Sequence, residues 1–220
     1  MYLCTLLSQT AFKIVSYDDH YLLHQNVYGN EVLDDIWRSI TSAIYCDCFE
    51  KNSFSKKYKW LIKHYQKRYI ANEFDVKFIV NSIAKYLKLD GYIKVNAVVE
   101  SAAKNNLAGW FIPIAAKGCE INIVVYDGIN IEQLITVCFH ELIHFFYYTN
   151  GIEFGEYNEV ATDAALIYFG LDDIAVKGYE QYRVIGKRYI NNSRTKQCGY
   201  LTPESLNYLI MKKCGKQILN

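Results

Sequence analysis

Residues 140–144 read His-Glu-Leu-Ile-His and contain two of the chain's five histidines. Side chains four residues apart lie one turn apart on the same face of a helix, so both imidazoles can bind one metal ion. Glu141 projects toward the neighbouring part of that face, where its carboxylate can reach a metal-bound water rather than the metal itself. The residue types and their spacing therefore predict a metal site on one face of a helix.

Apolar side chains surround this motif, which predicts a helix over residues 131–149 that is buried nearly all round. They are Ile131, Leu134, Ile135, Val137, Cys138, Phe139, Leu142, Ile143, Phe145 and Phe146. Two imidazoles and a carboxylate in such a helix carry a large desolvation cost unless they are paired or bind a metal. The context favours a metal site, and the alternative is a polar network in the core without a metal.

A third ligand is expected, because catalytic zinc usually takes three protein ligands and leaves one position for water. No histidine follows His144, so the third ligand is a carboxylate or a histidine from upstream. Glu159 and Asp163 lie four apart on the next apolar helix. Glu159 can bind the metal there, and Asp163 can accept a hydrogen bond from the free ring N–H of a ligand histidine. Glu153 and Glu156, in the connecting loop, are the alternatives for the third ligand.

Together, HELIH at 140–144 and Asn-Glu-Val-Ala-Thr-Asp at 158–163 resemble the gluzincin pattern of zinc metallopeptidases. In that pattern HExxH is followed by Glu-x-x-x-Asp on a second helix. The short connection is similar to that of the minigluzincins and of the metallopeptidase domain of the ImmA/IrrE group. The resemblance covers about residues 92–170 and implies a zincin-like fold.

The resemblance also implies a role for each residue of the motif. One zinc ion per chain would be held by three ligands, which are His140, His144 and Glu159. Glu141 would act as the general base, and Asp163 would support a ligand histidine from outside the ligand set. A histidine further along the chain, which helps to stabilise the oxyanion in thermolysin-like enzymes, is missing.

The activity implied is zinc-dependent hydrolysis of peptide bonds in a protein or peptide substrate. Zinc lowers the pKa of its water to about 7, and Glu141 takes the proton and returns it to the leaving amine. A hydroxyl donor for the oxyanion could come from Tyr157, Tyr168 or Tyr179, among which the sequence does not choose. The alternative function is a non-catalytic zinc-binding regulatory or interaction protein on a zincin-like fold. Glu141 argues against it, because a purely structural zinc site does not use a base.

The elements that must position these residues follow from hydrophobic periodicity and from capping signals. Helices are expected at about 31–50, 53–69, 74–88, 131–149, 157–169 and 172–190, with a last helix from Thr202-Pro203, and strands at 92–99 and in a hairpin over 109–127. The predicted fold class is α+β. A small mixed sheet with an edge hairpin packs on the helix of residues 140–144 and on the second ligand-bearing helix. Residues 1–90 form a helical cap or scaffold, residues 91–220 form the core, and the two make one compact unit.

Composition narrows the class of protein. Hydrophobic residues make up 51% of the chain and charged residues 21%, with a net charge of +1, which excludes a disordered chain and a coat for nucleic acid. Seven scattered cysteines without a CxxC pair are typical of reduced thiols in a cytosolic protein. No apolar run is long enough to span a membrane. We therefore expect a cytoplasmic protein with a protein or peptide substrate and neither nucleic-acid nor membrane partners.

Overall fold

Helices packed on one small β-sheet make up the structure, which is a computed structural model. It describes residues 28–44, 59–65, 73–100, 108–115, 117–126, 129, 131–176 and 200–215. The elements are α2 (Asn30–Ala43), α4 (Glu73–Tyr86), β1 (Tyr92–Glu100), β2 (Gly109–Ala115), β3 (Gly118–Tyr126), α5 (Ile131–Asn150), the 3-10 turn η1 (Gly155–Tyr157), α6 (Asn158–Tyr168) and α8 (Pro203–Lys213). Short helical segments also cover residues 59–65 and 172–176. The α+β class predicted from the sequence is confirmed.

The sheet has the strand order β1-β3-β2 and is mixed, as predicted. β1 runs parallel to β3, and β2 returns antiparallel to β3 as the other arm of the hairpin. Within β3, Ile121, Ile123 and Val125 are buried and alternate with residues of the opposite face. Of these, Glu120 accepts a hydrogen bond of 2.7 Å from the Asn96 amide on β1, and the Asn122 side-chain amide lies 2.8 Å from the same Asn96 nitrogen. The pattern places one apolar face of the sheet against helices.

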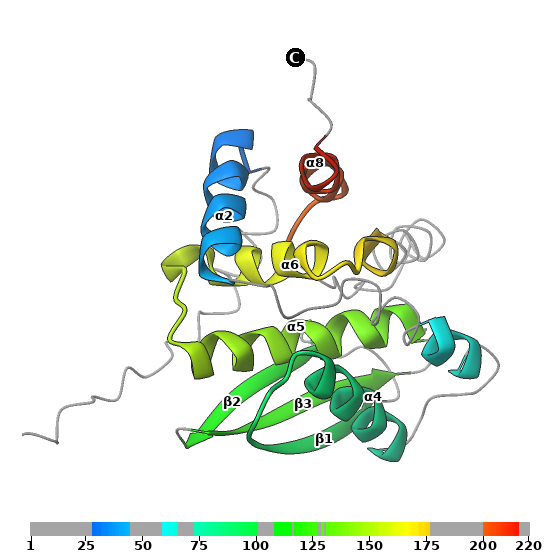
Figure 1. Cartoon of the computed structure of the whole chain (residues 1–220). Helices are drawn as coiled ribbons and strands as arrows, with labels where there is room; N and C mark the ends of the chain where they lie inside the picture. Colours follow the sequence, from blue (N-terminus) through cyan, green and yellow to red (C-terminus); the bar gives the residue numbers. More distant parts are fainter. Residues whose placement is uncertain are drawn as a thin grey trace, which may run out of the picture.

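The helices form successive layers above the sheet (Figure 1). α5 lies across the sheet, α4 packs against α5 and β1, and α6 lies on the side of α5 away from the strands. α2 and α8 in turn pack on α6 and on each other. Because α5 is covered on both sides, 14 of its 20 residues are buried, as its apolar sequence predicts. The core also contains Cys119 and Cys138 as free, buried thiols.

The structure agrees with the predicted ends of the helices at 131–149 and 157–169 and with the predicted start of the last helix. Gly151 and Gly170, just after α5 and α6, have positive φ angles of 63° and 89°, which glycine adopts without a steric penalty. Thr202 caps α8, and its hydroxyl accepts the Ser205 N–H at 3.2 Å. The helix expected over 172–190 is seen at 172–176, and the rest lies outside the described residues. The helix predicted over 31–50 ends at Ala43, with Ile44 as its cap.

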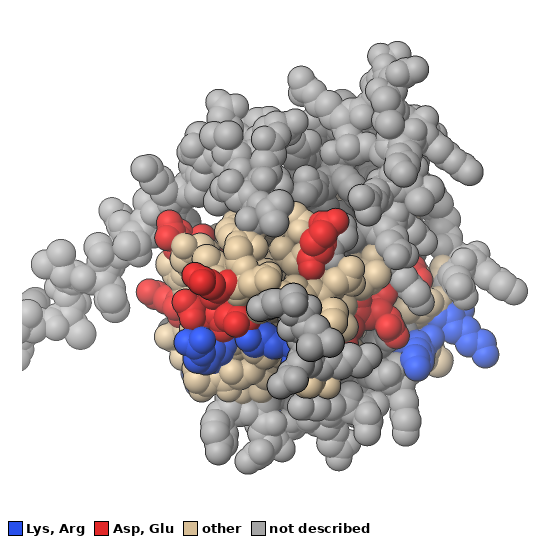
Figure 2. Space-filling view, turned by 90° about the horizontal axis from the view of Figure 1, so that it is seen from above, with Lys and Arg blue, Asp and Glu red and all other residues tan. Residues whose placement is uncertain are grey.

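Polar contacts hold α8 to its neighbours. The Asp34 carboxylate of α2 accepts hydrogen bonds from the Lys212 ammonium and, at 2.6 Å, from the Tyr208 hydroxyl. Lys213 pairs with Asp172 at 2.7 Å. On the described part of the face seen from above, basic side chains lie beside acidic ones (Figure 2). Among the helices that the structure describes, none has the length and apolar character needed to cross a membrane.

Candidate metal centre

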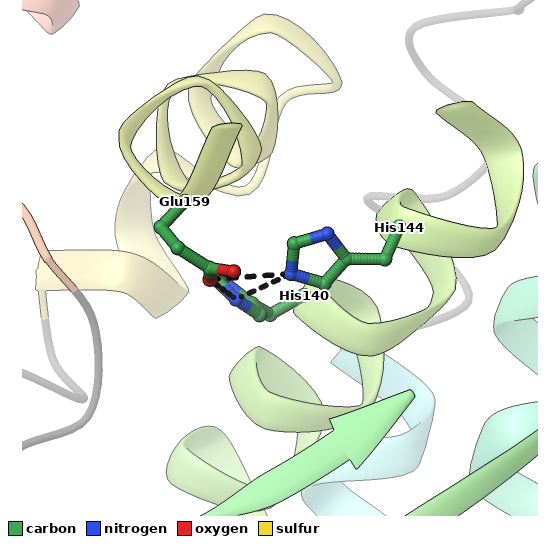
Figure 3. A group of neighbouring side chains, drawn as sticks. All are labelled: His140, His144 and Glu159. Atoms are coloured by element: carbon green, nitrogen blue, oxygen red, sulfur yellow. Dashed lines mark hydrogen bonds and ion pairs between the residues drawn. The ribbon is translucent and has the colours of Figure 1, made fainter. Parts of the chain in front are cut away.

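Three potential metal ligands converge between α5 and α6 (Figure 3). His140 and His144 project from one face of α5, and Glu159 reaches them from the first turn of α6. The Glu159 Oε2 atom lies 3.0 Å from His140 Nε2 and 3.2 Å from His144 Nε2, and the two nitrogens lie 3.1 Å apart. These side chains are therefore close enough to hold one metal ion together.

The donor set and its spacing fit zinc. Two imidazole nitrogens and one carboxylate oxygen are ligands that zinc prefers, and ligand atoms ~2.0–2.1 Å from a tetrahedral ion lie about 3.3 Å apart. The three separations here are within a few tenths of an ångström of that value. Three protein donors also leave one tetrahedral position for water or substrate. The Glu159 side chain is 35% exposed, whereas the side chains of His140 and His144 are 11% and 12% exposed.

Asp163 fixes the orientation of the first histidine. Its side chain is almost completely buried, and its Oδ1 atom lies 2.8 Å from His140 Nδ1. A carboxylate can only accept here, so Nδ1 carries the proton, and Nε2 is the ring nitrogen left to bind a metal. The other oxygen of Asp163 accepts the backbone N–H groups of Tyr200 and, at 3.2 Å, of Leu201. This carboxylate thus holds the ring in the tautomer that a metal ligand requires.

The second histidine has a weaker partner of the same kind. The Asn158 side-chain nitrogen Nδ2 lies 3.3 Å from His144 Nδ1. If His144 binds a metal through Nε2, its Nδ1 carries the proton and needs an acceptor. Asn158 would be that acceptor with its amide turned so that the oxygen faces the ring.

The charges around the triad favour a cation at its centre. Burial alone lowers the pKa of His140, but Asp163 and Glu159 outweigh burial and raise that pKa well above its usual 6.5. Burial likewise opposes ionisation of Glu159, but His144 and His140 outweigh it and hold the pKa of Glu159 well below its usual range. Two carboxylates beside two imidazoles are stabilised by a proton or by a metal ion.

Glu141 lies beside the triad without belonging to it. Its residue surface is only 6% exposed, and burial raises its pKa above the usual carboxyl value, although His140 and His144 oppose that rise. Strand β2 begins against it: a Cβ atom added to Gly109 would lie 3.0 Å from Glu141 Oε1. A raised pKa makes the carboxylate a stronger base, which suits a group that takes a proton from water and returns it.

The remaining site predictions fall in several places. Glu153 and Glu156 are exposed, on the connection between α5 and α6, and they are outside the triad. The Tyr168 hydroxyl donates to the Ile44 carbonyl at 2.9 Å, toward α2. The Tyr157 ring packs edge-on against Tyr28 with ring centroids 6.4 Å apart. Tyr179 lies outside the described residues, as do His20 and His24, two of the three histidines upstream of the motif.

Tyr200 contacts the triad, although no pattern in the sequence indicates this. Its ring stacks on His140 with centroids 5.9 Å apart and planes 16° apart. Burial raises the pKa of Tyr200 far above its usual value, and the nearby carboxylates raise it further, so the hydroxyl stays protonated. In the sequence Tyr200 lies two residues before the Thr202 cap, but no local pattern indicates that this residue contacts α6.

Comparisons with known proteins add no assignment: no protein-family model matches the chain, and neither does any curated protein or solved structure.

Proposed function

We propose that the protein is a zinc-dependent metallopeptidase of the gluzincin type, with a zincin-like core formed by the sheet, α5 and α6. The observation that carries this proposal is the convergence of His140, His144 and Glu159 next to the buried carboxyl group of Glu141. A structural zinc site is usually closed by four protein ligands, whereas three ligands beside a potential base are typical of a hydrolytic site. This combination supports an enzyme over a non-catalytic zinc-binding protein.

The residues at the candidate metal site have different proposed roles in the reaction. Zinc, when bound, supplies a Lewis acid and lowers the pKa of water. Glu141 takes the proton from the attacking water and delivers it to the leaving amine, and its raised pKa suits both steps. Asp163 keeps the lone pair of His140 Nε2 directed at the metal position. The partial exposure of Glu159 leaves a path by which a peptide can approach.

The edge of β2 with which no described strand pairs is the surface that we propose for binding an extended peptide. In the described part of the chain β2 pairs with β3 alone. The Ala108 carbonyl accepts the Val124 N–H at 2.9 Å, so the alternation of an antiparallel ladder directs the backbone groups of Gly109 and Phe111 away from β3. Pro113 has no N–H to offer. A peptide strand added here would pair with Gly109 and Phe111, beside Glu141 and His144.

Metal analysis and two pairs of variants test the proposal. We expect one zinc ion per chain in the purified protein and cleavage of unstructured protein substrates such as casein. Glu141→Gln should keep the zinc and lose the cleavage, because it removes the base but no ligand. Glu159→Ala should weaken zinc binding far more than Glu153→Ala. Zinc binding without any cleavage would favour the regulatory alternative, and protein without zinc affinity would refute the site.

A further inference from the structure

Positive charge is concentrated in one part of the chain, although the total of +1 argues against a protein that coats nucleic acid. Residues 51–88 contain 10 Lys and Arg but only 2 Asp and Glu, whereas the rest of the chain contains 14 and 21. The structure describes two helical segments of this region, which are residues 59–65 and α4. Such an asymmetry indicates a local surface for an anionic partner rather than a charge spread over the whole protein.

The two segments lie side by side (Figure 1). The Tyr65 hydroxyl donates to the buried Asp75 carboxylate at 3.1 Å, and the Trp60 and Phe78 rings have centroids 6.1 Å apart. Each segment buries an apolar face in the core, with Leu61 and Tyr65 from residues 59–65 and Val76, Ile79, Val80 and Ile83 from α4. The core therefore fixes both segments and leaves their outer sides to form one surface.

Aromatic rings and ammonium groups share this outer surface. Trp60, Phe74 and Phe78 are the exposed Trp and Phe residues in the part of the chain that the structure describes, and Phe74 is 75% exposed. Phe74 and Phe78 lie one turn apart on α4. Lys59 and Lys63 are also one turn apart and exposed, next to Trp60 on the neighbouring segment. Exposed apolar rings that gather on one surface mark a binding site, and the lysines select an anionic ligand.

We propose that the outer surface of residues 59–65 and α4 binds single-stranded nucleic acid. Unpaired bases stack on exposed aromatic rings, and lysines attract the phosphates, so both parts of the strand have a matching kind of side chain here. A duplex would leave the rings unused, because its bases are already stacked on one another. A helix that lies in a membrane surface places its apolar face in the lipid, whereas both segments place that face in the core.

Fluorescence anisotropy with labelled oligonucleotides of about 20 nucleotides tests the proposal, with oligo(dT) and oligo(U) to distinguish DNA from RNA. We expect the wild type to bind, with an affinity that falls about 10-fold or more between about 50 and 200 mM salt, because binding releases counterions from the phosphates. Lys59→Gln combined with Lys63→Gln should weaken binding and reduce its dependence on salt. Arg38→Gln combined with Lys117→Gln is the matched control, because it removes two exposed cations elsewhere, and it should bind as the wild type does.

Phe74→Ala tests the contribution of the rings. The Phe74 side chain is largely exposed, so we expect the variant to fold, and its affinity for the oligonucleotide should fall about 5-fold or more because a base loses its stacking partner. Met211→Ala removes an exposed apolar side chain from α8 and should leave the affinity unchanged.

Several outcomes would overturn the proposal. They are no binding of either oligonucleotide at low salt, equal losses in the variants and their controls, and equally tight binding of polyglutamate or of phosphatidylserine vesicles. The last result would show that an acidic protein or an anionic membrane suffices. None of these measurements depends on zinc or on peptide cleavage, so their failure is distinct from a failure of the proposed function.

Discussion

Glu141 and Glu159 are both acidic residues beside the histidine pair, yet their surroundings affect them in opposite directions. Burial dominates at Glu141 and raises its pKa, whereas the imidazoles dominate at Glu159 and lower its pKa. A group with a raised pKa suits proton transfer, and one that stays ionised suits metal binding. The proposed roles of base and ligand are consistent with this difference, because Glu159 is hydrogen-bonded to both rings whereas Glu141 is governed by burial.

The burial of Glu141 predicts a cost in stability. Because the pKa of Glu141 is higher in the folded state than in the unfolded state, ionisation of this group destabilises the fold. The protein is most stable below the unfolded pKa, and it loses that stability as the pH rises through the folded pKa. Metal-free Glu141→Gln should therefore be more stable than metal-free wild type at pH 7, by roughly 1–3 kcal/mol. The difference should shrink as the pH falls toward the usual carboxyl value of 4.5. Urea unfolding at several pH values measures it.

Glu204→Gln provides the control for this prediction. Glu204 is exposed in the first turn of α8, so its replacement should produce no comparable gain. A Glu141→Gln variant that is less stable than the wild type at neutral pH would contradict the assignment of a desolvated, ionised carboxylate at this position.

Asn158 gives a second prediction at the residue scale. Its amide lies next to His144 Nδ1, and it should accept the ring proton when His144 binds a metal. Asn158→Ala should weaken zinc binding about 10-fold, while Asn158→Asp, which keeps an acceptor, should bind zinc at least as well as the wild type. Competition titration measures both. Unchanged affinity in Asn158→Ala would show that His144 is oriented without this side chain.

At the scale of elements, local patterns predicted most of the site. The apolar periodicity of α5 and α6, their glycine ends and the spacing of His140 and His144 are all properties of contiguous segments. The hairpin was predicted in the same way, but the pairing of β1 alongside β3 is a long-range contact that no local signal specifies. Tyr200 shows the same limit, because it meets Asp163 across 37 residues and is one of 20 tyrosines.

The start of β2 is where the sheet meets the proposed base, and Gly109→Ala tests this contact. The added Cβ would lie 2.9 Å from Val137 Cγ1 and 3.0 Å from both the Asn122 carbonyl oxygen and Glu141 Oε1, so β2 or Glu141 must shift. We expect peptide hydrolysis to fall about 10-fold or more, because small displacements of a catalytic group are costly. Zinc affinity should not change, since Glu141 is not a ligand.

Gly118→Ala, on β3, is the matched control for that variant. A Cβ there would meet no atom closer than 3.5 Å, which is ordinary van der Waals contact. Its activity should equal that of the wild type. Equal losses in both variants would indicate a general effect on the hairpin rather than a specific contact with Glu141.

At the scale of the whole molecule, the candidate metal site lies between α5 and α6, and each of these helices packs against further elements. α5 packs on the sheet, and α6 is covered by α2 and α8. The Asp34 carboxylate of α2 accepts hydrogen bonds from Lys212 and Tyr208 of α8. Two ligands come from α5 and one comes from α6, so the three donors meet only when these layers are packed (Figure 3). The unfolded chain cannot reproduce this arrangement, and zinc should therefore bind the folded state selectively.

Selective binding makes thermal stability depend on zinc. A ligand at 1,000 times its Kd adds about 4 kcal/mol to the folded state, and each kcal/mol shifts the Tm of a chain of this size by roughly 2–4 °C. Removing zinc with a chelator should thus lower the Tm by about 8–16 °C, and adding zinc back should restore it. Glu159→Ala should lose this response, because a ligand is missing, whereas Glu153→Ala should keep it. Calorimetry measures both, and a wild-type Tm that is indifferent to zinc would mean that the triad is a polar network without a metal.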